Sequence, residues 1–356
     1  MVRIYLFLLL VIPSLIAANH NITDHEQDRG TQSKDGLDDR LLIDVSPQNL
    51  QERVIEATLR DFNTLPIDQE EAFLYQPIAI DVVPNGDLYV LDYGDHFVKR
   101  YTQDGTLVNR YGHGQGAGPG ETRNPTDVAV ASGSGGVWIN DQQGRKVEFF
   151  DAEGDHISAV RTDHGAWRIA ALQNGRVNAA FGAHAEHMVS IADLQATEFL
   201  QTSPPVIEEQ QYNVKVLEGE TAAAGGHVIH VPHYGGLIFS YSLSDSKYSY
   251  VREQVNPPSL PFMQRTGDGD TGSIGLPYRD LNYRNLSVHA DDESIYILVY
   301  RQTDESVDYF IDKYELDNGE YEYSYKLEKG FRDFAISEES FFLIDGENLY
   351  YSSDEL

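Results

Sequence analysis

Apolar and polar residues alternate in short runs along most of the chain, and each run ends in a tight-turn sequence. The run at residues 78–82 is followed by Pro84-Asn85-Gly86-Asp87 and then by a second run at residues 88–91. Later runs end at Asp-Gly in positions 104–105 and at Glu-Gly in positions 153–154. A period of two residues with such breaks predicts short β-strands rather than helices.

Two of these groups of runs repeat each other at an offset of about 49 residues. Residues 88–92, Leu-Tyr-Val-Leu-Asp, return as residues 137–141, Val-Trp-Ile-Asn-Asp. Three further positions repeat at the same offset: Val98, Tyr101 and Gly105 correspond to Val147, Phe150 and Gly154. Pro77 returns as Pro125, one residue out of step. A repeat that holds about four strands predicts one blade of a β-propeller.

The remaining runs predict an all-β, six-bladed propeller with four-stranded antiparallel blades, with five or seven blades as the alternatives. Two blades span about residues 76–111 and 125–160, and a third begins at 167–171. The later strands diverge; the fourth blade holds 228–231, 237–241 and 248–251, the fifth 286–288, 295–300, 310–314 and 321–325, and the sixth 331–336, 341–344 and 349–352. Because the sixth blade lacks a strand, we expect the N-terminal segment 53–61 to pair with residues 349–352 and to close the ring.

The N-terminus predicts export. Arg3, an apolar run at residues 4–16 and Ala17-Ala18 are typical of a signal peptide over residues 1–18, with an uncleaved anchor as the alternative. Residues 19–48 carry few large apolar side chains and predict a disordered acidic linker, which leaves residues 49–356 for the propeller. The chain has no cysteine, so disulfides and zinc–thiolate sites are excluded. We expect a periplasmic, cell-surface or secreted monomer with no stable membrane span after signal cleavage.

The net charge of −31 narrows the range of partners. A surface of that sign repels nucleic acid and anionic membranes, and it keeps an exported protein hydrated, notably in high salt. It also permits attraction of cations and basic peptides.

One segment resembles a known family. Residues 111–121, Tyr-Gly-His-Gly-Gln-Gly-Ala-Gly-Pro-Gly-Glu, precede Asn124-Pro125-Thr126-Asp127-Val128-Ala129-Val130. This resembles the inter-blade signature of NHL-type and TolB-like propellers, and more narrowly of exported six-bladed propellers of Bacteroidetes-like bacteria. That family places an aromatic residue where Thr122 stands, so the packing beneath the loop is expected to differ. The resemblance implies the fold and export, and no reaction. Because the glycines precede a strand rather than a helix, they indicate backbone conformation and not a phosphate site.

A few side chains are candidate metal ligands. Loops of adjacent blades could bring His187 together with His230 or His233 for zinc. Asp268 and Asp270, in the Pro- and Gly-rich loop 256–280, suit calcium but lack the spacing of an EF-hand. For all five residues a structural or surface role is the default interpretation, a zinc or calcium site is the alternative, and no cofactor is expected. Asp92 and Asp141, at equivalent strand ends, predict carboxylates that accept turn amides.

The sequence therefore favours a non-enzymatic binding or scaffold propeller that recognises a peptide, a protein or a small polar ligand at one mouth. A metal-dependent hydrolase or lyase, lactonase-like or lyase-like, is the alternative. No Gly-x-Ser-x-Gly motif and no cysteine nucleophile occur. An enzyme should show carboxylate, Asn or His side chains from three or more blades converging on the axis with shifted pKa values, whereas a binding protein should show an aromatic and polar mouth.

Overall fold

The structure is a computed structural model. It describes residues 41–130, 136–181, 187–194, 199–206, 217–258, 264–266, 273–275, 283–303, 306–337 and 340–352. The predicted signal peptide and most of the predicted linker lie outside the described residues. Among the residues described, no helix is long and apolar enough to cross a membrane.

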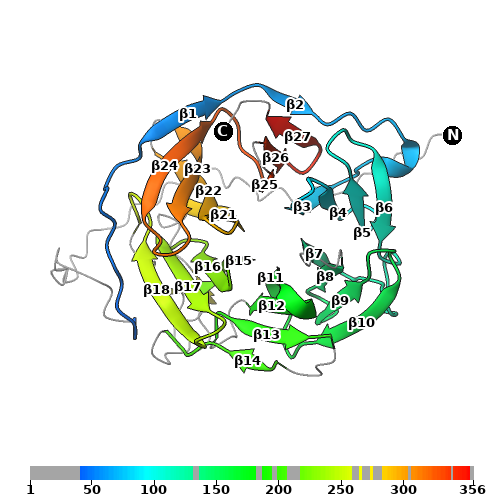
Figure 1. The fold of residues 1–356 in the computed structure, drawn as a ribbon, viewed down its shortest axis with the longest axis horizontal. Coiled ribbons are helices and arrows are strands. Elements are labelled where there is room, and N and C mark those ends of the chain that lie inside the picture. The colour runs from blue at the N-terminus through cyan, green and yellow to red at the C-terminus, as the bar shows by residue number, and fades with distance from the viewer. Residues whose placement is uncertain are drawn as a thin grey trace. The chain divides into compact units, whose positions relative to one another are not determined.

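Six sheets surround a common axis, so the predicted six-bladed propeller is confirmed (Figure 1). The first blade holds β3 (Pro77–Val82), β4 (Leu88–Asp92), β5 (Phe97–Tyr101) and β6 (Leu107–Tyr111), and the second holds β7 (Pro125–Val130), β8 (Val137–Asp141), β9 (Lys146–Phe150) and β10 (His156–Arg161). The third holds β11 (Ala166–Leu172), β12 (Arg176–Phe181), β13 (Ser190–Asp193) and β14 (Gln201–Thr202), and the fourth holds β15 (Gly219–Ala224), β16 (His227–Pro232), β17 (Leu237–Ser242) and β18 (Lys247–Glu253). The fifth holds β21 (Tyr283–Ala290), β22 (Ser294–Gln302), β23 (Val307–Glu315) and β24 (Tyr321–Leu327), and the last holds β25 (Asp333–Ser337), β26 (Ser340–Ile344) and β27 (Leu349–Ser352). The first strand of each blade lies nearest the axis (Figure 1).

Apolar residues on both faces of the blades hold neighbouring blades together. Between the first and second blades, Tyr89 and Leu91 pack in one cluster with Val128, Ile139 and Phe150. The second strands of these blades, β4 and β8, are buried along their whole length. A strand buried on both faces reads as a nearly continuous apolar run, which explains why the 49-residue repeat is clearest in these two strands.

The N-terminal segment closes the ring, but the residues that pair differ from the prediction. β2 (Phe62–Thr64) pairs antiparallel with β27 and supplies the fourth strand of the last blade. β1 (Ile55–Leu59), in the middle of the predicted segment, instead runs parallel to β24 as a fifth strand of the preceding blade. Closure by an N-terminal strand is thus confirmed, whereas pairing of residues 53–61 with 349–352 is wrong. The chain turns at Asp61 and reaches the last blade only afterwards.

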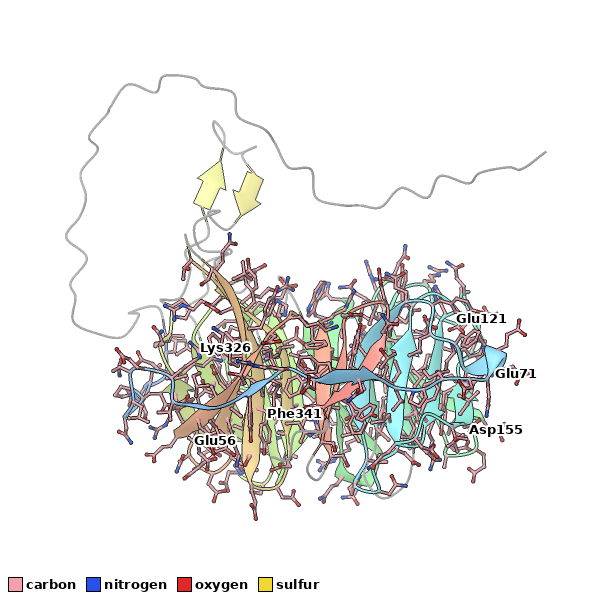
Figure 2. The ribbon with its side chains drawn as sticks, turned by 90° about the horizontal axis from the view of Figure 1, so that it is seen from above. Glu56, Glu71, Glu121, Asp155, Lys326 and Phe341 are labelled. Carbon is pink, nitrogen blue, oxygen red and sulfur yellow. The ribbon has the colours of Figure 1, made fainter. Side chains whose placement is uncertain are left out.

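Residues 41–64, here called the belt, run along the outer rim; Figure 2 shows β1 and β2 crossing it, with Glu56 and Lys326 labelled on β1 and β24. Leu42 donates its N–H to the carbonyl of Val206, and Val45 is buried. The side chain of Gln48 donates to the carbonyl of Gly319 at 2.6 Å. The ordered chain therefore begins before the predicted boundary at residue 49, because residues 41–48 have backbone and side-chain partners on the blades.

Two elements have no counterpart in the predicted strands. β15 is the inner strand of the fourth blade, and its sequence Gly-Glu-Thr-Ala-Ala-Ala lacks the large β-formers that mark a strand. A two-stranded hairpin, β19 (Gln264–Thr266) and β20 (Ser273–Gly275), lies within the predicted long loop.

Candidate functional site

The inner strands of all six blades line an axial channel with a cavity of about 140 Å³. Its polar lining residues come from every blade: Asp81, Asp127, Arg168, Glu220, Thr221, Ser287, His289 and Asp333. Each of these residues stands on the strand that begins its blade, because only those strands reach the axis.

Three of the channel aspartates join one blade to the next. Asp333 accepts the backbone N–H of Ile80 at 2.9 Å, which links the last blade to the first. Asp81 accepts the N–H of Val130 at 2.8 Å, and Asp127 that of Ile169 at 2.7 Å. In each aspartate the second carboxylate oxygen accepts the N–H of the following residue. The three carboxylates thus satisfy backbone donors at three successive blade junctions.

Burial in the channel shifts the pKa values of these groups. Desolvation raises the pKa of Asp81 to about 7 and that of Asp333 to about 6, while their hydrogen bonds act in the opposite direction. Desolvation also raises the pKa of Asp127, against the attraction of Arg168. Carboxyl groups with raised pKa values resist ionisation, so closing the ring costs free energy once the pH exceeds their ordinary pKa.

An ion pair joins the third blade to the fourth. Arg168 Nε donates to Glu220 Oε2 at 2.5 Å, and Glu220 Oε1 lies 2.8 Å from His233 Nε2. Although desolvation opposes ionisation, the charge of Arg168 and the contact with His233 lower the pKa of Glu220 to about 2. Glu220 is therefore an anion, and it compensates the charge of Arg168.

The next junction uses an amide. Asn285 Nδ2 donates to the carbonyl of Pro232 at 2.7 Å, and the N–H of Asn285 donates to the carbonyl of His233. These contacts join the fourth blade to the fifth without a charged group.

One end of the channel opens into a hollow of about 540 Å³, here called the mouth pocket. It lies where the inner strands begin, since its lining residues precede the channel residues in the same strands. Its polar and aromatic lining consists of Gln76, Tyr93, Asn124, Thr126, Trp167, Arg168, Arg284 and Arg332. In a chain with a net charge of −31, three arginines gather at this one opening.

A second hollow of about 600 Å³, here called the tyrosine pocket, shares Arg284, Leu286 and Arg332 with the mouth pocket. Its other lining residues are Tyr234, Tyr300, Tyr309, Gly330, Phe331 and Asp345. The rings of Tyr300 and Tyr309 lie 5.6 Å apart, and the guanidinium of Arg284 lies 5.8 Å from the centre of the Tyr234 ring. The two hollows together form one cationic and aromatic opening.

Polar groups of this opening lack partners within the described part of the chain. Arg284 Nε and Trp167 Nε1 are both buried and make no hydrogen bond there. Neither Arg284 nor Arg332 has a carboxylate partner among those residues, unlike Arg168. Partial desolvation and the charges of Arg168 and Arg284 lower the pKa of Arg332. A buried donor without an acceptor costs about 1–3 kcal/mol, so an acceptor placed at these donors would stabilise the opening.

The candidate histidine ligands make contacts of their own. His187 Nδ1 contacts the carbonyl of Ser203, His230 Nε2 that of Leu217 at 2.7 Å, and His233 contacts Glu220. Desolvation lowers the pKa of buried His230 to about 4, so its imidazole is neutral. His230 and His233 lie near Glu220 in the fourth blade, while His187 belongs to the third. Within the described residues no group of three potential ligands could hold a metal ion, and Asp268 and Asp270 lie outside them.

Two expectations about structural residues are confirmed. Asp92 accepts the backbone N–H groups of Tyr75, Gln76 and Gly94, and Asp141 accepts the equivalent groups at its own strand end. In the glycine-rich loop, Gly112 and Gly120 have φ values of 114° and 74°, and a strand follows the loop.

Thr122 replaces the family's aromatic residue with a polar contact. It is fully buried, and its Oγ1 lies 3.1 Å from Nδ1 of His96. The loop is therefore held partly by hydrogen bonds where the family pattern places a ring.

The sequence reasoning missed the residues of the opening. Glu220 stands on the unpredicted strand β15. Arg168, Arg284 and Arg332 each stand at or just before the start of an inner strand, in three different blades. A cation that recurs at the same place in divergent blades is a signal that could have found them, once those strand starts were aligned.

Comparisons with known proteins agree with this architecture. The NHL repeat family model matches residues 74–101, within the first blade. A protein of Bacteroides fragilis described as exported is 12% identical and has a TM-score of 0.56, over 86% of this chain and 99% of its own. A DUF4221 family member from Bacteroides vulgatus is 11% identical with a TM-score of 0.57, over 85% and 98% of the two chains.

A virginiamycin B lyase from Staphylococcus aureus is also similar, at 8% identity and a TM-score of 0.47, over 82% of this chain and 98% of its own. A likeness this distant carries no argument about activity. A search of curated protein sequences gave no match. The expected resemblance is confirmed: the chain is a six-bladed β-propeller that carries an NHL repeat in its first blade and resembles exported bacterial propellers in fold.

Proposed function

We propose that this protein is an exported, non-enzymatic binding protein that captures a small polar ligand at the mouth of its axial channel. The observation that carries the proposal is the opening itself, where three arginines, Trp167 and five other aromatic rings line two connected hollows. Concave sites of about 300–1,000 Å³ with aromatic walls and a few polar groups are typical of small-ligand binding. The N-terminal residues 1–18 and the exported Bacteroides neighbour support export.

The alternative, a hydrolase or lyase, needs free catalytic carboxylates at the axis. Carboxylates from four blades do converge there with shifted pKa values. However, both oxygens of Asp81, Asp127 and Asp333 accept backbone amides, and Glu220 is engaged by Arg168 and His233. Their arrangement is accounted for by the joining of blades, so the convergence favours assembly over catalysis.

Tryptophan fluorescence offers a direct test. The chain contains two tryptophans; Trp138 is fully buried in the second blade, and Trp167 lines the mouth pocket. Small acids, sugars and short peptides would be screened for compounds that raise the melting temperature and change tryptophan emission. We expect the emission change to disappear in Trp167→Phe. If no compound acts, or if emission responds equally in Trp167→Phe, the mouth is not a binding site.

A further inference from the structure

The chemistry of the opening points to a class of ligand, an inference that rests on the proposed function. The arginines in the opening are not equivalent. Arg168 is paired with Glu220, whereas Arg284 and Arg332 face the two hollows and make no ion pair among the described residues. Asp345, which also lines the tyrosine pocket, is paired with Lys329. Like charges repel, so an anion bound between these two unpaired guanidinium groups would relieve the repulsion between them.

Guanidinium groups select the shape of that anion. The planar fork of N–H donors matches the oxygens of a carboxylate or a phosphate, and such charge-assisted bonds are about twice as strong as neutral ones. Arg284 Nε, buried and without a partner in the described chain, is one such donor. Arg332 is exposed at the opening, which leaves its donors accessible to a solute.

The tyrosine pocket indicates what the anion is attached to. Tyr234, Tyr300, Tyr309 and Phe331 provide flat apolar surfaces beside the same two arginines. A glycine is required beside Tyr309: a Cβ at Gly330 would lie 2.4 Å from Cζ of Tyr309 and would displace that ring. Aromatic faces bind aromatic rings, and the C–H faces of sugar rings, by burying apolar area.

We propose that the opening binds a small ring compound bearing one oxyanion, a carboxylate or a phosphate, with the oxyanion held by Arg284 and Arg332 and the ring in the tyrosine pocket. Trp167 Nε1 supplies a donor for a polar substituent of the ring. The two sources of the oxyanion, a carboxylic acid and a phosphate ester, share this chemistry and are separated by the choice of probes.

Calorimetric titration of the full chain would use four probes: phenyl β-D-glucuronide, phenyl β-D-glucoside, phenyl phosphate and inorganic phosphate. The glucuronide and the glucoside differ only at C6, which is a carboxylate in the first and a hydroxymethyl group in the second. We expect the glucuronide or phenyl phosphate to bind at least about tenfold more tightly than the glucoside, because each charge-assisted hydrogen bond contributes about 1.5–3 kcal/mol. Tighter binding of phenyl phosphate identifies a phosphate ester, and tighter binding of the glucuronide a carboxylic acid.

Variants assign the two halves of the site. Arg284→Gln and Arg332→Gln should each weaken the preferred anionic probe by about tenfold or more and leave the glucoside unchanged. Gly330→Ala should weaken the ring compounds and spare inorganic phosphate. Arg161→Gln is the matched control, since Arg161 lies exposed on the outer strand β10. Because the side chain of Arg332 has no hydrogen-bond or ion-pair partner among the described residues, its variant should keep the wild-type melting temperature.

Equal affinities for glucuronide and glucoside, or anionic binding that both arginine variants leave intact, would overturn the assignment of an oxyanion. Binding of the glucoside that depends on Trp167 would then preserve the proposed function while rejecting this ligand class. If neither ring-bearing oxyanion binds at millimolar concentration, the ligand class is also rejected, and the screen by Trp167 emission decides the proposed function independently.

Discussion

Arg168 on β11 and Glu220 on β15 form an ion pair with Nε and Oε2 2.5 Å apart, and this pair is a charged link between the third and fourth blades. The side chain of Arg168 is 20% exposed and that of Glu220 5%. Arg168 also lines both the mouth pocket and the channel. The pair therefore holds two blades together and also forms part of the wall of the candidate site.

Removing the carboxylate of Glu220 should destabilise the fold. In Glu220→Gln the buried charge of Arg168 loses its compensation, which typically costs about 3–5 kcal/mol. Urea unfolding would measure the change. Glu328→Gln is the control, because its pair with Arg60 is exposed at 65% and 52% and should change stability by no more than about 1 kcal/mol. Equal small effects in the two variants would show that the inner pair does not stabilise the ring.

The buried carboxyl of Asp81 should make stability fall as the pH rises. Its pKa is about 7 in the folded chain and 3.8 in the reference state, so the unfolded chain loses this proton first and the cost grows from pH 3.8 to 7. Asp81→Asn removes that cost and also one amide acceptor. Between about pH 4 and pH 7.5 the variant should therefore gain about 1–3 kcal/mol relative to the wild type.

Two buried histidines make stability rise with pH, opposite to Asp81, and their effect must be distinguished from that of Asp81. Burial lowers the pKa of His230 and of His289 to about 4, so their contribution to stability is lost as the pH falls from 6.5 to 4. Both remain in Asp81→Asn, and their effect cancels in the comparison with the wild type. Asp163→Asn, at an exposed position, should show no pH-dependent difference. A constant difference between wild type and Asp81→Asn across this range would contradict a raised pKa for Asp81.

The belt should depend on a buried ion pair. Arg53 Nη2 lies 2.7 Å from Asp312 Oδ2, and the two side chains are 6% and 0% exposed. Arg53→Met should cost about 3–5 kcal/mol because Asp312 keeps a buried charge. It should also speed proteolysis within residues 41–64, measured by mass spectrometry of limited digests.

A double variant checks the physical reason for that effect. In Arg53→Met/Asp312→Leu both charges are replaced by apolar groups, and most of the lost stability should return. If the double variant is as unstable as Arg53→Met, the packing of Arg53 rather than its charge holds the belt. If Arg53→Met is cleaved faster elsewhere in the chain while the belt stays intact, the ion pair does not hold the belt in place.

Added salt should stabilise the protein. With a net charge of −31, folding brings repelling charges together, and the screening length falls to about 3 Å at 1 M salt. A melting series in sodium chloride should rise and then level off; a flat or falling series would contradict the repulsion argument. A sharp rise at millimolar calcium, beyond sodium at matched ionic strength, would instead reveal a specific cation site and favour the candidates Asp268 and Asp270.

The fold could be predicted from the sequence alone, because strands and turns are local features. The repeat of residues 88–92 at 137–141 reflects the same buried strand in two blades, and turn chemistry such as Asn85-Gly86 marks the ends of strands. The role of Asp92 and Asp141 could also be predicted, since each accepts backbone N–H groups at its own strand end. The need for an N-terminal strand followed from the three-stranded remainder at the C-terminus.

The segment that closes the ring and the place of the candidate site depend on contacts between distant parts of the chain, and the sequence pattern did not reveal them. Residues 55–59 and 62–64 are separated by only two residues, yet they pair with strands of two adjacent blades, and no local pattern distinguishes the two partners. Arg168, Arg284 and Arg332 are more than 40 residues apart along the chain, and they meet because three inner strands start at the same end of the axis. No local pattern encodes that meeting, since it depends on closing the sheets around an axis.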